Sequence, residues 1–270
     1  MVRGPDSEQP LRGASALSRR RFLKSFAVIG TGSMFGAAFL QRVAAADDLV
    51  QTTTSVDGDH RWVMIFDLRR CDGCLECIAG CQEMHFLSED QEWIKVYEMT
   101  DTTGGTYFMP VLCQMCENAP CVRVCPVGAT FHTSDGGILV DQDVCIGCRM
   151  CMAACPYGVR VFNWADSVVP VPSEVRSTNP LFTAPQRRGT VGKCDNCIHA
   201  LRSGEFPACL LSCSMDAIYV GDLITDVATN ERETVVLSQF LRDNDAFRFK
   251  EELGTETRVY YIAGHAQDLD

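Results

Sequence analysis

The residues with the clearest capacity for chemistry in this 270-residue chain are its 16 cysteines, which fall into four groups of four. We call each group a quartet and number the quartets in chain order. The first and third share the spacing C-x2-C-x2-C-x3-C, and the second and fourth are longer variants of it. The quartets are Cys71, Cys74, Cys77 and Cys81; Cys113, Cys116, Cys121 and Cys125; Cys145, Cys148, Cys151 and Cys155; and Cys194, Cys197, Cys209 and Cys213.

The spacing of the first and third quartets is typical of the bacterial ferredoxin run that binds [4Fe–4S] clusters. Such a cluster is a cube of iron and sulfide in which each iron takes one thiolate from the protein. Cysteines three positions apart on a tight loop can reach three irons of one cube. Four quartets therefore predict four [4Fe–4S] clusters, and a series of clusters within one chain is a path for electrons.

Two other uses of cysteine explain the pattern less well. Exported proteins often contain disulfides, and C-x-x-C units also bind structural zinc. Zinc sites, however, pair two such units across a longer spacer, whereas the four cysteines of each regular quartet lie within eleven residues. Disulfides are disfavoured if the protein is exported already folded, because metal is then inserted in the reducing cytoplasm.

The N-terminal segment indicates that kind of export. Residues 18–24 read S-R-R-R-F-L-K, which matches the twin-arginine signal, and residues 26–40 form a short, uncharged and mostly apolar run. Ala44-Ala45-Ala46 then supplies a small-residue cleavage site. We predict that residues 1–46 are a twin-arginine signal peptide that directs the folded protein to the periplasm. A membrane anchor is the weaker alternative, because a membrane span needs about 20 apolar residues.

Charge also distinguishes this segment from the rest of the chain, whose overall net charge is −11. Residues 1–46 hold seven basic and two acidic residues, so the remainder holds 17 basic and 33 acidic residues, a net charge of −16. An acidic surface repels the phosphates of nucleic acids and favours a partner with a basic patch. Beyond Ala46 no uninterrupted apolar stretch reaches 18 residues, so we expect no membrane span in the mature chain.

Short strand signals flank the quartets and must position them. Strands are predicted at residues 62–68, 92–98, 159–162 and 217–220, and a hairpin at 129–132 and 138–140. The unit of strand, cysteine loop, short helix and strand recurs four times, and two units make one ferredoxin fold. We predict an α+β protein with two ferredoxin-like modules of the double βαβ type, each carrying two [4Fe–4S] clusters, with loop insertions and a C-terminal extension.

The fourth cysteine of each quartet decides how the quartets combine. In two-cluster ferredoxins it ligates the other cluster of the pair. The second and third quartets lie close in sequence and both end in Cys-Pro, so we predict that they pair and that the first and fourth pair around them. The expected ligands are Cys71, Cys74, Cys77 and Cys213 for cluster 1; Cys113, Cys116, Cys121 and Cys155 for cluster 2; Cys145, Cys148, Cys151 and Cys125 for cluster 3; and Cys194, Cys197, Cys209 and Cys81 for cluster 4.

This pairing predicts the domain organisation. An outer module comprises residues 59–105 with 190–221, and an inner module comprises residues 106–164. Residues 165–189, which contain several prolines, are predicted to be an irregular arm. Residues 222–270 form a C-terminal extension with a helix near 233–242 and a strand at 258–262. The arm and the extension contain no cysteine, so we expect them to contact a partner or to cover a sheet edge.

A few other residues lie close enough to the quartets to matter. His85, four residues after Cys81, is interpreted as a surface residue, with a place near a cluster as the alternative. Lys193 and Arg149 either raise the reduction potential of a cluster through their charge or are simply solvated. No Ser–His–Asp set or glycine-rich phosphate loop stands out. We therefore predict that the chain is not an enzyme on its own.

With these motifs the chain resembles the four-cluster iron–sulfur subunits of molybdopterin oxidoreductases, which serve dimethyl sulfoxide, polysulfide and tetrathionate systems among others. The resemblance covers about residues 60–221, which include all four quartets, and the twin-arginine signal at residues 18–24 is a separate feature that agrees with it. The flanking stretches that match are D-L-R-R-C at 67–71, C-E-N-A-P-C at 116–121, C-P-Y-G at 155–158 and K-C-D-N-C at 193–197. Some relatives lack one cysteine and hold a [3Fe–4S] cluster, whereas this chain keeps all sixteen.

The resemblance implies a role in electron transfer without catalysis. Electrons would pass between a periplasmic catalytic subunit, of molybdopterin type, and a polytopic membrane subunit that reacts with quinone. Two alternatives come from other functional classes. One is a docking subunit in which some clusters are only structural, and the other is a stand-alone periplasmic polyferredoxin. The arm and the extension argue against the latter, because a diffusing carrier needs neither.

Overall fold

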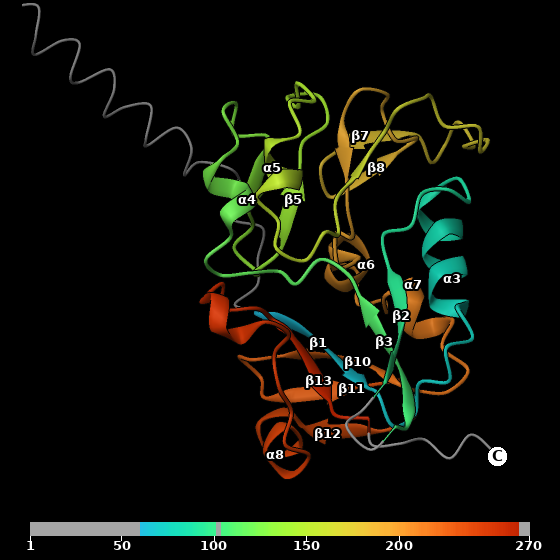
Figure 1. The fold of residues 1–270 in the computed structure, drawn as a ribbon. Coiled ribbons are helices and arrows are strands. Elements are labelled where there is room, and N and C mark those ends of the chain that lie inside the picture. Colours follow the sequence, from blue (N-terminus) through green and yellow to red (C-terminus); the bar gives the residue numbers. More distant parts are fainter. Residues whose placement is uncertain (1–59, 101–103, 265–270) are drawn as a thin grey trace, which may run out of the picture. The chain divides into compact units, whose positions relative to one another are not determined.

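The structure is a computed structural model that describes residues 60–100 and 104–264, and the predicted signal peptide lies outside the described residues. Short strands alternate with short helices along the chain (Figure 1). The fold is thus mixed α and β with little helix, as the sequence predicts. Among residues 60–100 and 104–264, no helix is long and apolar enough to cross a membrane. In chain order the elements are β1 (Trp62–Asp67), α3 (Glu76–His85), β2 (Lys95–Thr100), β3 (Thr106–Val111), α4 (Pro120–Arg123), β4 (Thr130–His132), β5 (Ile138–Val140), α5 (Met150–Ala153), β6 (Val161–Phe162), β7 (Ser177–Asn179), β8 (Phe182–Ala184), β9 (Val191–Gly192), α6 (Ile198–Arg202), α7 (Ala208–Leu211), β10 (Ile218–Asp222), β11 (Val227–Thr229), β12 (Thr234–Val236), α8 (Leu237–Asp243), the 3-10 helix η1 (Glu251–Leu253) and β13 (Val259–Ile262).

A five-stranded sheet joins parts of the chain that are far apart in sequence. Its strand order is β12-β11-β10-β1-β13. Strand β1, before the first quartet, pairs antiparallel with β10, after the fourth, with Met64 opposite Val220. Strand β13 runs parallel to β1 on its other side. The two ends of the cysteine-containing region are therefore held together by backbone hydrogen bonds.

Both faces of this sheet are covered, because successive side chains of a strand point to opposite faces. On β1, Val63 and Ile65 pack in a cluster with Leu237 of α8. Met64 and Phe66 pack in the larger core that also contains most of the buried cysteines. Residues 62–68 are almost all apolar because both faces of β1 are buried. The large core lies on the cysteine side of the sheet.

Helix α3 contains Cys77 and Cys81 of the first quartet, and α7 contains Cys209 and ends just before Cys213 of the fourth. Helix α3 packs against α7, and Gly80 makes the close approach possible. A Cβ atom at Gly80 would lie 2.0 Å from Ser212 Oγ and 2.7 Å from Ser212 Cβ. Helices α4 and α5, in the second and third quartets, are in contact in the same way. The sequence-predicted hairpin between these quartets is confirmed as β4 and β5.

The C-terminal extension closes over the second quartet in addition to supplying β13. The amide of Arg258 donates to the carbonyl of Gln114, at 2.9 Å. The amides of Glu117 and Asn118 donate to the carbonyls of Glu256 and Thr255, at 2.9 and 3.0 Å. The extension is thereby a structural part of the cysteine region. The predicted strand at 258–262 is confirmed as β13.

Three elements differ from the sequence prediction. The helix predicted near residues 233–242 begins only at Leu237, because residues 234–236 pair with β11 and Asp226 Oδ1 accepts the amide of Ser238 at 2.7 Å. The strand predicted at 92–98 begins at Lys95, because its partner strand β3 ends at Val111, opposite Lys95. Within residues 165–189, β7 and β8 form a short hairpin that the proline content did not indicate.

Candidate metal centres and their surroundings

The four C-x-x-C loops share one backbone feature. The residue directly before the second cysteine has a positive φ in every quartet, and these residues are Gly73, Met115, Gly147 and Asn196. Glycine and asparagine adopt this conformation readily, whereas Met115 does so at a cost. Backbone turns of this kind direct successive N–H groups into a concave surface that suits anionic groups, iron–sulfur clusters included.

The thiols of the first quartet lie near Cys213, as the predicted ligand sets require. Burial raises the pKa of Cys77 to about 12, and the nearby charges of Cys71, Cys213 and Cys74 raise it further. One pocket is lined by all four of these cysteines. The thiol of Cys81 lies instead among the cysteines of the fourth quartet. Its pKa is raised well above the ordinary value by burial, then by Cys194, Cys209 and Cys197.

The second and third quartets exchange their fourth cysteines in the same manner. Burial raises the pKa of Cys116 to about 12, and the charges of Cys113, Cys121 and Cys155 act in the same direction. The pKa of Cys151 is raised by burial and by Cys145 and Cys125. A second pocket is lined by Cys125, Cys145, Cys148 and Cys151. The structure therefore brings the thiols near one another in four groups, which we call the cluster 1 to cluster 4 groups; that each group ligates one cluster stays a prediction.

These thiol groups suit bound iron. A thiol as deeply buried as Cys194, whose pKa burial raises to about 12, stays protonated at neutral pH unless a metal ion takes the place of the proton. Cys125 differs, because its pKa is lowered. Burial opposes the thiolate there, but backbone amides at residues 127–130 outweigh that cost. A [4Fe–4S] cluster bound to four such sulfurs supplies one-electron reduction and oxidation.

Comparison with known proteins agrees with this donor set. The 4Fe-4S dicluster domain matches residues 105–170. A Halobacterium salinarum protein, named provisionally as an iron–sulfur subunit of dimethyl sulfoxide reductase, is 37% identical over 217 residues, which cover 74% of this chain and 78% of the relative. The chain belongs to this family of reductase iron–sulfur subunits. A selenate reductase subunit of Mesobacillus selenatarsenatis is 34% identical over 216 residues, 75% of this chain and 72% of the relative. The iron–sulfur cluster-binding subunit of menaquinone reductase from Nitratidesulfovibrio vulgaris is 33% identical over 235 residues, 75% of this chain and 89% of the relative.

In this iron–sulfur subunit, charges that act between different thiol groups indicate which groups are neighbours. Burial raises the pKa of Cys209, in the cluster 4 group. Nearby charges raise it further, and one of them is Cys77 of the cluster 1 group. The pKa of Cys194 is raised by burial, by Asp195 and then by Cys113 of the cluster 2 group. Arg160 lies close to both Cys121 and Cys151, from the cluster 2 and cluster 3 groups. Neighbouring groups therefore follow the order 1, 4, 2, 3.

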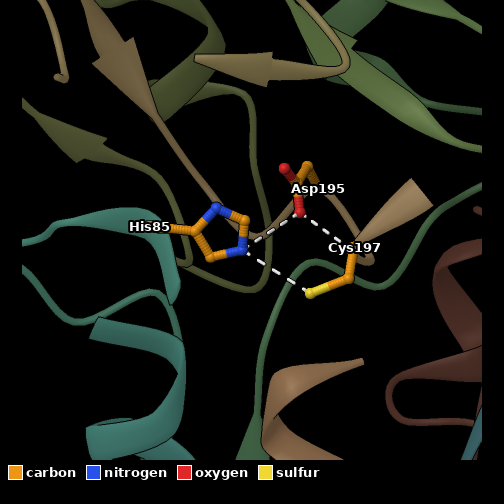
Figure 2. Close-up of side chains that lie close together, drawn as sticks. All are labelled: His85, Asp195 and Cys197. Atoms are coloured by element: carbon orange, nitrogen blue, oxygen red, sulfur yellow. Dashed lines mark hydrogen bonds and ion pairs between the residues drawn. The ribbon is translucent and has the colours of Figure 1, made fainter. Parts of the chain in front are cut away.

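His85 is a buried neighbour of the fourth group, so its interpretation as a surface residue was wrong. Only 1% of the residue is exposed. Figure 2 shows its ring facing Asp195 and Cys197, with Nε2 3.6 Å from Asp195 Oδ1 and 3.5 Å from Cys197 Sγ. A sequence signal existed, because Cys77, Cys81 and His85 are four residues apart and share the buried face of α3.

The three donors of His85, Asp195 and Cys197 lie within 4.8 Å of one another and could hold a single metal ion. Cys197, however, also belongs to the cluster 4 group, and one thiolate does not complete both sites. Burial lowers the pKa of His85, although the charge of Asp195 opposes this effect. The neutral imidazole is therefore best described as a neighbour that faces a cluster ligand.

Positive charges near the cysteines fall into two classes. Arg149 is exposed and stacks over Trp164, 5.0 Å from the ring centroid, and it also lines the pocket of the cluster 3 group, so both interpretations of it stay predictions. Lys193 is buried and donates hydrogen bonds to the carbonyls of Ile138 and Cys194, the latter at 2.7 Å. Arg160 was missed by the sequence reasoning. The sequence did contain an indication that Arg160 is buried, because it is the one charged residue in the apolar strand predicted at residues 159–162.

Proposed function

We propose that this chain relays electrons through four [4Fe–4S] clusters between a periplasmic catalytic subunit of molybdopterin type and a quinone-reactive membrane subunit. The observation that carries this proposal is the gathering of sixteen thiols from four quartets into four groups, each containing one cysteine from a partner quartet. Catalysis would reside in the partner, since the relatives are subunits of reductase complexes.

The order of the groups supports a single path from one end to the other. Cysteines of the cluster 2 and cluster 4 groups are mostly buried, which insulates the middle of the path from solvent. Exposed cysteines occur only in the end groups of the described chain, at Cys74 in the cluster 1 group and Cys148 in the cluster 3 group. Electrons would therefore enter and leave through clusters 1 and 3.

Exposed apolar side chains at both ends support docking of partners there. Leu75, 50% exposed, and Met215, 40% exposed, line the pocket of the cluster 1 group. Ile146, 62% exposed, and Val127, 39% exposed, line the pocket of the cluster 3 group. Apolar residues exposed beside redox centres bring a partner's own centre close and exclude water.

Export and assembly follow from the same proposal. The twin-arginine signal would deliver the folded chain, with its clusters, to the periplasm, where partners would hold it at the inner membrane. The ligand sets of clusters 1 to 4 and the outer and inner modules belong to this proposal. The strand pairing of β1 with β10 and the contact of α3 with α7 support the outer module. The contact of α4 with α5 supports the inner one.

Purification from native membranes tests the assignment. The tagged chain, solubilised in mild detergent, is expected to copurify with a molybdopterin-containing protein and a multi-helix membrane protein. Adding a quinol analogue, or the reduced form of the catalytic subunit, should then change the visible absorption of the clusters. Recovery of the chain alone from the soluble periplasmic fraction would favour the stand-alone polyferredoxin instead. Copurification without any reducible cluster would favour the docking subunit.

A further inference from the structure

Arg160 is a buried cation that forms no ion pair with a carboxylate of residues 60–100 or 104–264. The residue is 5% exposed and lies between Val159 and the start of β6. Its Nη1 donates to Thr130 Oγ1 at 3.3 Å. Its Nη2 is buried and has no hydrogen-bond partner among the described residues. An uncompensated buried guanidinium is strongly unfavourable, so some other negative charge must account for its position.

Cysteines of two different cluster groups would supply that negative charge as thiolates once clusters are bound, and Thr130, which accepts from Arg160, lines the pocket of the cluster 3 group. Burial opposes the charged form of Arg160, but Cys121, Cys113 and Cys151 outweigh it and raise the pKa of the guanidinium. The influence is mutual. Burial raises the pKa of both Cys121 and Cys151, and Arg160 is the largest influence that lowers it in each. Cys113 and Cys121 belong to the cluster 2 group and Cys151 to the cluster 3 group.

We propose that Arg160 is a shared counter-charge between clusters 2 and 3, which stabilises the reduced form of both and raises their reduction potentials together. This inference rests on the proposed function, because it requires that both groups hold a cluster. Reduction adds one negative charge to a cluster, and the net charge and surroundings of a cluster set its potential. A cation buried between two clusters acts through a medium of low dielectric, where its effect is much larger than in water.

The shared position has a functional consequence. A cation next to one cluster alone would make that cluster an electron trap, whereas a cation between two clusters raises both and keeps the step between them small. Because a guanidinium does not lose its proton in proteins, this contribution is independent of pH. The exposed Arg188, which lies outside the thiol groups, offers a contrast, since its charge is screened by water.

The test is a potentiometric titration, followed by EPR, of the anaerobically purified full chain and its Arg160→Gln variant. We expect two of the reduction steps to move together to lower potential, while the other two keep their values. The expected size is about tenfold in the ratio of reduced to oxidised cluster at a fixed solution potential, equivalent to about 59 mV for a one-electron couple. Arg160→Lys keeps the charge and should shift the same two steps in the same direction by less.

Controls separate the possible failures. Arg188→Gln removes an exposed charge outside the thiol groups and should shift no step. If Arg160→Gln retains the iron of the wild type but moves no step, one step or all of them equally, the shared counter-charge is refuted. If Arg160→Gln loses iron, the Arg160→Lys variant is titrated instead. A joint shift of two reduction steps in that variant supports the shared counter-charge, and any other pattern refutes it. A wild-type chain without the expected iron would overturn the proposed function itself, and iron analysis shows that separately.

Discussion

The fourth cysteine of each quartet is the residue whose placement determines how the thiol groups are built. Cys81 and Cys213 exchange places between the first and fourth quartets, and Cys125 and Cys155 between the second and third. Cys81 lies within α3, and Cys125, Cys155 and Cys213 lie shortly after α4, α5 and α7, each near the thiols of the partner quartet. The geometry therefore ties the groups into two pairs.

Replacing Cys155 with Ser tests this exchange. We expect the variant to lose or alter the cluster ligated by Cys113, Cys116 and Cys121, because the hydroxyl is a poorer ligand for iron than a thiolate. The EPR spectrum of Cys155→Ser should thus match that of Cys121→Ser and differ from that of Cys148→Ser. A spectrum that matches Cys148→Ser would place Cys155 on the cluster of its own quartet and overturn the pairing.

At this scale the sequence located the cysteines but not their buried neighbours. The ligand sets combine the spacing with the rule that the fourth cysteine ligates the other cluster of a pair, and they stay a prediction. The burial of His85 and Arg160 was not predicted, because each depends on contacts with distant segments. His85 faces the loop before α6, and Arg160 contacts cysteines of two quartets. No local pattern records such contacts.

The contact of α3 with α7 is the element that holds the first and fourth quartets together. Gly80 of α3 faces Ser212 at the end of α7 so closely that no side chain fits. In an exposed helix, alanine would be more stable than glycine by about 1 kcal/mol. At this position the clash reverses that preference, so the glycine serves packing between elements.

Gly80→Ala tests this packing. The new Cβ would lie 2.0 Å from Ser212 Oγ, and overpacking of this kind costs about 1–3 kcal/mol of stability. We expect earlier loss of cluster absorption on anaerobic heating. The double variant Gly80→Ala with Ser212→Gly should recover most of the loss, because it removes the clashing side chain.

Glu83→Ala, on the exposed side of the same helix, is the control and should change stability by less than about 0.5 kcal/mol. If Gly80→Ala is as stable as the wild type, or if Ser212→Gly gives no recovery, then α3 and α7 do not pack as described.

Element prediction was most accurate where the sequence pattern was local. The β4–β5 hairpin and β13 were found, whereas the start of α8 depended on β11 and on Asp226, and was misplaced.

At the scale of the whole molecule, described segments that are far apart in sequence lie together. The segments before the first quartet and after the fourth pair in one sheet, and the C-terminal extension returns to the loop of the second quartet. Folding of the chain and binding of iron should therefore be coupled. A protein of this kind benefits from export in the folded state.

The export proposal is tested by replacing Arg19 and Arg20 with Lys. The twin-arginine receptor reads that pair, so we expect the variant to accumulate in the cytoplasm with its clusters intact. Cell fractionation with periplasmic and cytoplasmic marker proteins measures the distribution. Replacing Arg3 and Arg12 with Lys, outside the motif, is the matched control and should leave export unchanged. Continued accumulation of the Arg19 and Arg20 variant in the periplasm would remove the basis for the proposed location.

The central claim is that the four thiol groups each hold a [4Fe–4S] cluster that can be reduced. Iron and acid-labile sulfide analysis of the anaerobically purified chain, combined with EPR on stepwise reduction, tests it most directly. Four clusters of four irons each predict about sixteen irons and about sixteen sulfides per chain, with several distinct reduction steps. A chain that contains about four irons or fewer, or that carries zinc in stoichiometric amounts in place of iron, would contradict the account.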